Sequence, residues 1–191
     1  MSLWPNPSTL PIDRFNLTPL AATPAGAANN EQVLILTPLK DAAPWLDEYF
    51  HNLEQLAYPP NLISLAFLVS DSTDGTLAKL EALATKYARG PKSKRFKRIT
   101  ILEKDFAFDL KSEARHGFEG QPVRRAFIAR ARNWLVTQAL RPEHSWVLWL
   151  DVDVVRYDPA IVGDLMSIDK DIVVPNTIWH QPDSWEFWVS R

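Results

Sequence analysis

Residues 146–155 read Trp-Val-Leu-Trp-Leu-Asp-Val-Asp-Val-Val, an apolar run that ends in two aspartates one residue apart. A short continuous apolar run is typical of a strand that is buried on both faces of a parallel sheet. In an extended segment, side chains two positions apart point to the same side, so we expect Asp151 and Asp153 to present their carboxylates together. The run therefore predicts a buried strand over residues 145–150 with an acidic pair at its carboxyl end.

The rest of the chain alternates between apolar runs and segments with helical spacing of apolar residues. Strands are predicted at residues 33–37, 62–69, 99–103, 145–150 and 171–174. Helices are predicted at residues 41–56, directly after the polar turn 70–76, at 121–140 and at 159–166, with a long loop at 104–120. Strands that alternate with helices indicate an α/β fold with a mainly parallel central sheet and helices on both faces.

Length and composition limit the classes of protein. The chain has 191 residues, 46% of them hydrophobic and 23% charged, which fits one globular domain. We expect a flexible Pro/Ala-rich leader at residues 1–30 and the folded domain at 31–191. The net charge of −2 gives no general attraction to nucleic acid, and the lack of cysteine excludes disulfides and zinc–thiolate sites. No stretch approaches the roughly 20 apolar residues of a membrane helix.

In parallel sheets, ligands bind beyond the carboxyl ends of the strands. Three polar segments are predicted to meet there: residues 37–41, residues 70–74 and the segment just after Leu150. The segment 70–76 also precedes a helix, so its Ser, Thr and Asp side chains have two interpretations. They either cap that helix or bind a ligand such as a ribose or base.

The acidic pair is the strongest indication of chemistry. Two carboxylates among apolar neighbours repel each other and lose solvation. A divalent cation removes both penalties, and Mg²⁺ or Mn²⁺ takes one or two carboxylates and fills its remaining positions with water and phosphate oxygens. Asp151 and Asp153 therefore indicate a metal-bridged diphosphate site. The alternative is a pair of solvated aspartates at a strand end.

The helix predicted at 121–140 is rich in arginine. It carries Arg124, Arg125, Arg130 and Arg132, with Asn133 next in the chain. Arginine suits phosphate because its forked donors carry a permanent charge. Most of these side chains are expected to make ordinary surface ion pairs, while one or two reach the active site.

Six segments, in order, resemble one known family. They are Leu-Thr-Pro-Leu-Lys-Asp-Ala at 36–42, Ile-Ser-Leu-Ala-Phe-Leu-Val-Ser-Asp at 63–71, Arg-His-Gly-Phe at 115–118, Ala-Arg-Ala-Arg-Asn at 129–133, His-Ser-Trp-Val at 144–147 and Asp-Val-Asp at 151–153. The chain resembles the fungal mannan polymerase α-1,6-mannosyltransferases, glycosyltransferase family 62, over residues 33 to about 175. Ser-Thr-Asp-Gly-Thr at 72–76 is similar to a turn of many GT-A nucleotide-sugar transferases.

This resemblance implies a GT-A fold and a retaining mannosyltransferase. GDP-mannose would be the donor, Mn²⁺ (or Mg²⁺) the metal, and an α-1,6-linked mannan or N-glycan outer chain the acceptor. It further implies a type II membrane protein of the Golgi lumen that assembles with other subunits of a mannan polymerase complex. The anchor would lie outside this chain.

The resemblance also assigns roles to particular residues. Asp151 and Asp153 match the D-x-D motif and are expected to act in catalysis by holding the metal. The first nucleotide-facing loop comprises Pro38, Leu39 and Asp41, and Asp71 lies near the nucleoside. The motif helix supplies Arg130 and Asn133, which we expect to contact the donor.

Two departures from the family pattern keep an alternative open. Leu150 stands where the family usually carries arginine, and the chain ends at Arg191, so we expect a GT-A domain that is incomplete at its C-terminus. The alternative is a non-catalytic or truncated member that acts as a subunit of the polymerase complex. A nucleotidyltransferase is a third hypothesis, which the absence of a Gly-rich phosphate loop opposes.

Overall fold

The computed structural model describes residues 14, 16, 21–106, 121–180 and 184–188. The first part of the predicted leader and most of the predicted loop at 104–120 lie outside these residues. The proposed division into leader and domain therefore stays a prediction.

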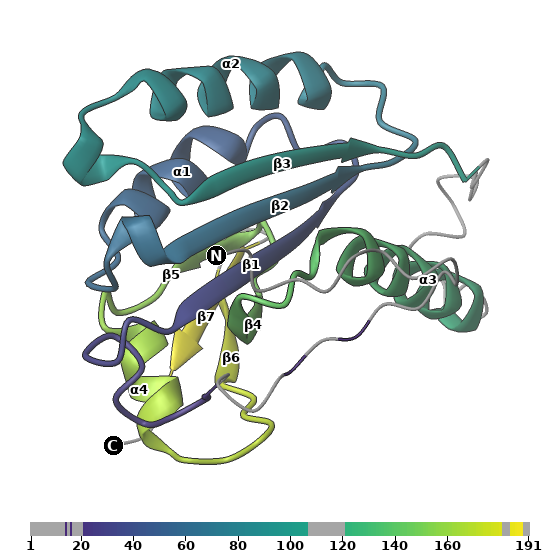
Figure 1. Ribbon diagram of the computed structural model, residues 1–191. Coiled ribbons are helices and arrows are strands. Elements are labelled where there is room, and N and C mark those ends of the chain that lie inside the picture. The colour runs from purple at the N-terminus through teal and green to yellow at the C-terminus, as the bar shows by residue number, and fades with distance from the viewer. Residues whose placement is uncertain (1–13, 15, 17–20, 107–120, 181–183, 189–191) are drawn as a thin grey trace, which may run out of the picture.

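The main sheet has four strands, all parallel. They are β1 (Gln32–Leu39), β2 (Ile63–Val69), β3 (Arg98–Glu103) and β4 (His144–Trp149). Their order across the sheet is β3-β2-β1-β4, as Figure 1 shows. All four strands were expected from their apolar runs, and β1 and β2 lie at the centre because their side chains are apolar on both faces.

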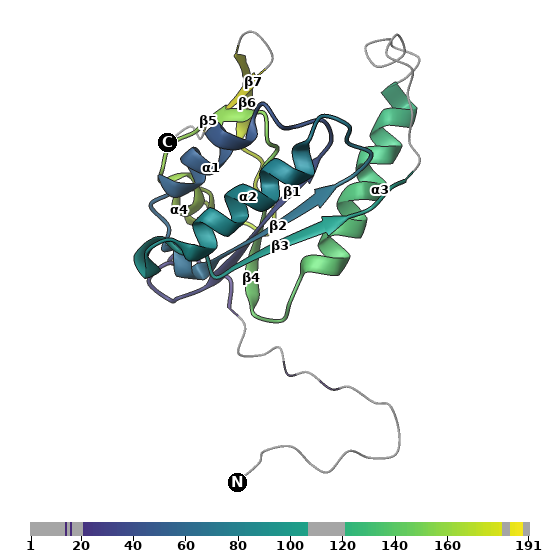
Figure 2. The same cartoon turned by 90° about the horizontal axis from the view of Figure 1, so that it is seen from above.

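Helices cover both faces of this sheet. On one face lie α1 (Leu46–Glu54) and α2 (Thr76–Arg89), and on the other lies α3 (Gln121–Ala139), as Figure 2 shows. Alternate residues of the central strands divide between the two layers: Phe67 stacks on Phe50 of α1, with ring centroids 5.6 Å apart, whereas Leu68 packs in the cluster that contains Leu135 of α3. The predicted fold class, a mainly parallel sheet with helices on both faces, is confirmed.

A second, smaller sheet follows β4. It comprises β5 (Val154–Arg156), β6 (Asn176–His180) and β7 (Ser184–Trp188) in the order β5-β7-β6, and α4 (Ile161–Ser167) lies between β5 and β6 in the chain. Short 3₁₀ turns span Pro60–Leu62 and Lys92–Lys94. Within the described residues, none of the helices is long and apolar enough to cross a membrane.

Two predicted elements are wrong in part. Residues 171–174 form no strand; Ile172 and Val174 are 84% and 82% exposed, and the strand begins later, at Asn176. A short apolar run becomes a strand only where a partner strand lies beside it. The first helix begins at Leu46 rather than residue 41, because Asp41 has a left-handed φ of 48° that a helix cannot continue.

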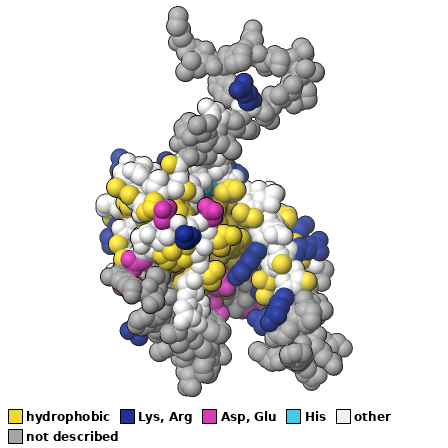
Figure 3. Space-filling model, turned by 90° about the horizontal axis from the view of Figure 1, so that it is seen from below, with side chains coloured by type: hydrophobic (Ala, Val, Ile, Leu, Met, Phe, Trp, Pro, Cys, Tyr) yellow, Lys and Arg dark blue, Asp and Glu magenta, His cyan; other side chains and the backbone are white. Residues whose placement is uncertain are grey.

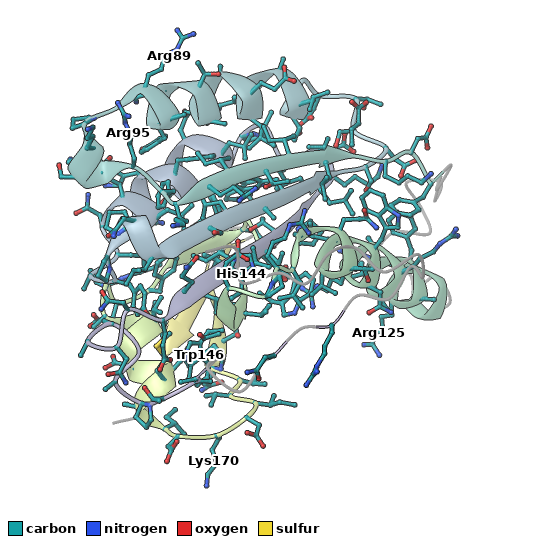
Figure 4. All side chains as sticks on the ribbon, in the orientation of Figure 1. Arg89, Arg95, Arg125, His144, Trp146 and Lys170 are labelled. Carbon is teal, nitrogen blue, oxygen red and sulfur yellow. The ribbon has the colours of Figure 1, made fainter. Side chains whose placement is uncertain are left out.

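The segment before β1 is tied to the body by Glu31. The carboxylate of Glu31 accepts hydrogen bonds from Thr23 and, at 2.7 Å, from the indole nitrogen of Trp146 on β4, a residue labelled in Figure 4. The Tyr58 hydroxyl donates to the Glu31 carbonyl at 2.6 Å. Burial raises the pKa of Glu31, but the donated hydrogen bonds outweigh it and the net pKa is lowered, so this buried carboxylate is charged.

Candidate active site

The candidate site lies where the strand order reverses, between β1 and β4. β2 follows β1 on one side, whereas β4 returns to pair with the other side of β1. A sheet of this kind opens a crevice at the carboxyl ends of the two strands that flank the reversal. Asp151 follows β4 at this end, and Pro38 and Leu39 end β1 there.

The acidic pair occupies a turn. The Val154 amide donates to the Asp151 carbonyl at 3.2 Å, so residues 151–154 reverse direction between β4 and β5. The expectation that the pair lies in an extended segment is therefore wrong; a turn lets the chain leave the main sheet for the smaller one. Burial, and then the negative charge of Asp151, raise the pKa of Asp153. The two carboxylates of the turn therefore still repel each other.

Buried hydroxyls hold this turn from beneath. The Thr37 hydroxyl donates to the Leu150 carbonyl at 2.9 Å and lies 2.5 Å from the Tyr49 hydroxyl. Since Thr37 uses its proton on Leu150, Tyr49 is the donor to Thr37. Burial, and to a smaller degree the charge of Asp151, raise the pKa of Tyr49, which keeps it a neutral donor. Helical spacing alone places Tyr49 on an apolar face, so the sequence does not reveal this contact.

Arg132 on α3 reaches the acidic turn. Its Nη2 atom donates to both carboxylate oxygens of Asp151, at 2.7 and 2.8 Å, and its guanidinium lies 5.4 Å from the ring centroid of Trp149. The Arg130 guanidinium lies over the Phe106 ring instead, 5.4 Å from its centroid. Asn133 is exposed on α3. The contact of Arg130 and Asn133 with a donor stays a prediction.

The loops after β1 and β2 are joined at the same edge of the sheet. Asp41 accepts a hydrogen bond from the Thr73 amide at 2.8 Å, and the Lys40 ammonium group donates to the Asp71 carbonyl. Asp41 and Asp71 both have left-handed backbones, with φ of 48° and 50°. Such conformations are costly for residues with a side chain and are found where the surroundings impose them, often at binding sites.

Within the polar turn 70–76, the Asp74 carboxylate binds backbone amides on either side of the loop, while Gly75 is the N-cap residue of α2. The Oδ1 atom of Asp74 accepts from the Thr76 amide at 3.0 Å, and its Oδ2 atom accepts from the Ala43 amide at 2.9 Å. Burial raises the pKa of Asp74, but these hydrogen bonds outweigh it and the net pKa is lowered. Asp71 is engaged differently: its carboxylate accepts from the Phe106 amide at 3.3 Å. Its bonds to backbone amides therefore explain Asp74, and a ligand role for Asp71 stays a prediction.

The residues of the first nucleotide-facing loop differ in exposure. Leu39 is 2% exposed and packs in the core, so only its backbone can face a ligand. Pro38 and Asp41 are half-buried. Leu150 is likewise buried in the core at 2% exposure, directly before the acidic turn.

The acidic turn offers two carboxylates to a metal ion. Among the described residues, no cluster of three or more His, Asp or Glu side chains is placed to hold one. Mg²⁺ and Mn²⁺ are often bound by only one or two carboxylates, with substrate phosphates and water completing the shell. The mutual repulsion of Asp151 and Asp153 is relieved by such a cation, so these residues fit an ion held jointly with a diphosphate.

Comparison with known families identifies the chain's relatives. The model of the Anp1 family matches residues 11–188. The chain belongs to the Anp1 family. It is 42% identical over 181 residues to the mannan polymerase II complex ANP1 subunit of Saccharomyces cerevisiae, covering 93% of this chain and 36% of that protein. It is 46% identical over 156 residues to the anp1 subunit of Schizosaccharomyces pombe, covering 80% and 36%.

A third relative is the mannan polymerase complex subunit MNN9 of Candida albicans, 39% identical over 170 residues, which cover 86% of this chain and 45% of that protein. The chain thus spans less than half the length of these relatives. The suspected membership of the mannan polymerase family is confirmed.

Solved structures give a weaker comparison. The Staphylococcus aureus protein TarS in complex with UDP matches with a TM-score of 0.41 and 17% identity, over 64% of this chain and 27% of TarS. The mannosyltransferase PcManGT of Pyrobaculum calidifontis, in complex with GDP-Man and Mn²⁺, matches with a TM-score of 0.36 and 21% identity, over 52% and 27%.

Proposed function

We propose that this chain carries the donor-binding part of a GT-A mannosyltransferase that transfers mannose from GDP-mannose to an α-1,6-linked mannan or N-glycan outer chain with retention of configuration. The observation that carries the proposal is the acidic turn of Asp151 and Asp153 at the carboxyl end of β4, where the strand order reverses. Membership of a family whose relatives are mannan polymerase subunits supports the choice of sugar.

The proposed roles follow from where the side chains lie. Asp151 and Asp153 hold Mn²⁺ or Mg²⁺, which would neutralise the charge that develops on the departing diphosphate. Thr37 and Tyr49 fix the backbone directly before the turn, and so fix the direction of the two carboxylates. Arg130 and Asn133 on α3, with Pro38, the Leu39 backbone, Asp41 and Asp71, bind the remainder of the donor.

A non-catalytic subunit of a polymerase complex is the second candidate, and exposed apolar side chains favour it. Ile168, Ile172 and Val174 are 41%, 84% and 82% exposed in the segment that links α4 to β6. Figure 3 shows hydrophobic side chains over much of the face of the molecule that is seen from below. Apolar exposure of this kind is common where another protein binds. Placement in the Golgi lumen, through an anchor outside this chain, belongs to either proposal.

The test is a calorimetric titration of GDP-mannose with and without Mn²⁺. Wild type is compared with the double variant Asp151→Asn/Asp153→Asn, which keeps the size of both side chains and removes both charges. We expect Mn²⁺-dependent binding that the double variant loses while its circular dichroism stays unchanged. A folded wild type that binds no GDP-mannose at millimolar donor would overturn the donor-site proposal.

Turnover then separates the enzyme from the subunit. Release of GDP is followed with α-1,6-mannobiose as acceptor. Binding together with turnover supports the transferase, and binding without turnover supports the second candidate. UDP serves as the control nucleotide, because tighter binding of UDP than of GDP would contradict the assignment of the donor.

A further inference from the structure

The ion pair of Arg132 with Asp151 affects how a metal ion and a nucleotide bind at the proposed site. The inference drawn from this ion pair rests on the proposed function. One guanidinium nitrogen, Nη2, donates to both carboxylate oxygens of Asp151, at 2.7 and 2.8 Å. Both oxygens of one expected metal ligand are thereby engaged by a positive charge. A divalent cation that binds Asp151 has to compete with this guanidinium.

The guanidinium of Arg132 has more hydrogen-bond donors than its ion pair with Asp151 uses. A guanidinium carries five N–H groups, and in the described residues the hydrogen bonds of Arg132 come from Nη2 alone. Within that same part of the chain, its Nε atom is buried and lacks a hydrogen-bond acceptor. The Trp149 ring, with its centroid 5.4 Å from the guanidinium carbon, supports the group from another side. Among the described residues, Arg132 is thus held beside the acidic turn by Nη2 alone, and its other donors bind no protein acceptor there.

We propose that Arg132 is a ligand-binding residue that exchanges one anion for another. In the protein without ligands it neutralises Asp151, and when the nucleotide diphosphate arrives it transfers to the phosphate oxygens and leaves Asp151 to the cation. A guanidinium matches a phosphate group at least as well as a carboxylate, so the exchange keeps its charge paired. The ion pair therefore disfavours the metal in the absence of nucleotide, and the nucleotide relieves this competition.

Such an exchange makes metal and nucleotide bind cooperatively, and the coupling has to be reciprocal. Its size is limited by exposure, because the side chains of Arg132 and Asp151 are 36% and 47% exposed. Partly exposed ion pairs contribute up to about 1 kcal/mol, and this converts to a factor of about five in a dissociation constant. Loss of the pair should therefore tighten binding of Mn²⁺ alone by roughly fivefold.

The test measures Mn²⁺ affinity by electron paramagnetic resonance, with and without saturating GDP, in wild type and in Arg132→Met. Methionine keeps an unbranched apolar stem against Trp149 and removes every donor. The matched control is Arg125→Met, because Arg125 is exposed on the same helix and projects away from the sheet in Figure 4. We expect Arg132→Met to bind Mn²⁺ alone about fivefold more tightly than wild type and to weaken GDP binding, while Arg125→Met matches wild type within twofold.

The decisive quantity is the factor by which GDP tightens Mn²⁺ binding. It should fall by about fivefold or more in Arg132→Met, which loss of general stability would not produce. An unchanged factor, or equal effects of the two variants, overturns the inference. If Arg132→Met loses its circular dichroism spectrum, Arg132→Lys replaces it: its single ammonium keeps the charge but not the planar fork, so the factor should fall at least twofold.

The two proposals fail in different ways. If wild type binds Mn²⁺ and GDP together and Asp151→Asn abolishes this, but Arg132→Met behaves as wild type, the donor site stands and only the exchange is refuted. If wild type shows no Mn²⁺-dependent binding of GDP, the proposed function and the exchange both fall.

Discussion

The hydroxyl pair beneath the acidic turn gives a prediction that can be worked from the geometry. Thr37→Val removes the group between Tyr49 and the Leu150 carbonyl, and valine has nearly the same shape as threonine. The change leaves two buried polar groups without their partner, the Tyr49 hydroxyl and the Leu150 carbonyl. Each such group costs about 1–3 kcal/mol, so we expect a loss of about 3 kcal/mol in the free energy of unfolding.

Tyr49→Phe should cost less. It removes one donor, and Thr37 keeps its bond to Leu150, so a loss of about 1 kcal/mol is expected. The double variant is the sharper test, because once the tyrosine hydroxyl is gone Thr37→Val leaves only the Leu150 carbonyl unpaired. We therefore expect the double variant to lose about 2–3 kcal/mol, less than the sum of the single losses.

Urea denaturation followed by circular dichroism measures all four proteins under one condition. The reasoning is refuted if Thr37→Val costs less than about 0.5 kcal/mol, or if the two losses add within error. The same variants should also weaken Mn²⁺ binding, because the backbone before Asp151 is no longer fixed. Unaltered Mn²⁺ affinity in a destabilised Thr37→Val protein would show that the hydroxyls stabilise the fold without positioning the carboxylates.

Three further predictions concern stability. Phe67 is fully buried against Phe50, so Phe67→Ala should lower the free energy of unfolding by about 3–5 kcal/mol. A loss below about 1 kcal/mol in urea denaturation would contradict the assigned core. The folded pKa of Glu31 lies below its usual 4.5, so the stability that Glu31 contributes is present above the unfolded pKa and is lost as pH falls through the folded pKa. Glu31→Gln should therefore flatten the dependence of the melting temperature on pH below about 5, and parallel curves for the two proteins would refute this. Asp41→Gly should be less destabilising than Asp41→Ala by about 1 kcal/mol in thermal melts, because only glycine adopts a φ of 48° without strain, and equal losses would contradict a strained backbone.

The sequence predicts the main sheet well because its strands are buried on both faces. Burial on both sides forces continuous apolar runs, and these are visible without knowledge of any partner strand. The sequence does not predict the smaller sheet, for the opposite reason. Its strand β5 has three residues, and the apolar residues 171–174 lie exposed in the loop before β6. Short runs become strands only through partners that are distant in the sequence, and local composition does not report these.

In the candidate site, too, the sequence predicts the residues of a local pattern but not the contacts that depend on tertiary packing. The sequence identifies Asp151 and Asp153 because two carboxylates after an apolar run are a local pattern. It does not identify Arg132 as the partner of Asp151, because that contact depends on how α3 packs across the sheet. Arg130, Arg132 and Asn133 belong to one motif, and periodicity alone does not say which of them turns toward β4. The packing of Ala131 and Leu135 against the sheet, at 3% and 0% exposure, fixes the rotation of the helix.

That rotation also places a positive charge beside the acidic pair, although leucine precedes the pair in the chain. The Leu150 side chain is 2% exposed in the core, while its backbone carries the hydrogen bonds that hold the turn. A charged side chain at this position and backbone would leave a cation among apolar neighbours, at a cost far above that of any surface ion pair. The positive charge beside Asp151 comes instead from Arg132, whose guanidinium is partly solvated and lies over the Trp149 ring. Arg132 lies on α3 and not directly before the turn. Its guanidinium can therefore change partners without disturbing the turn that presents the two carboxylates.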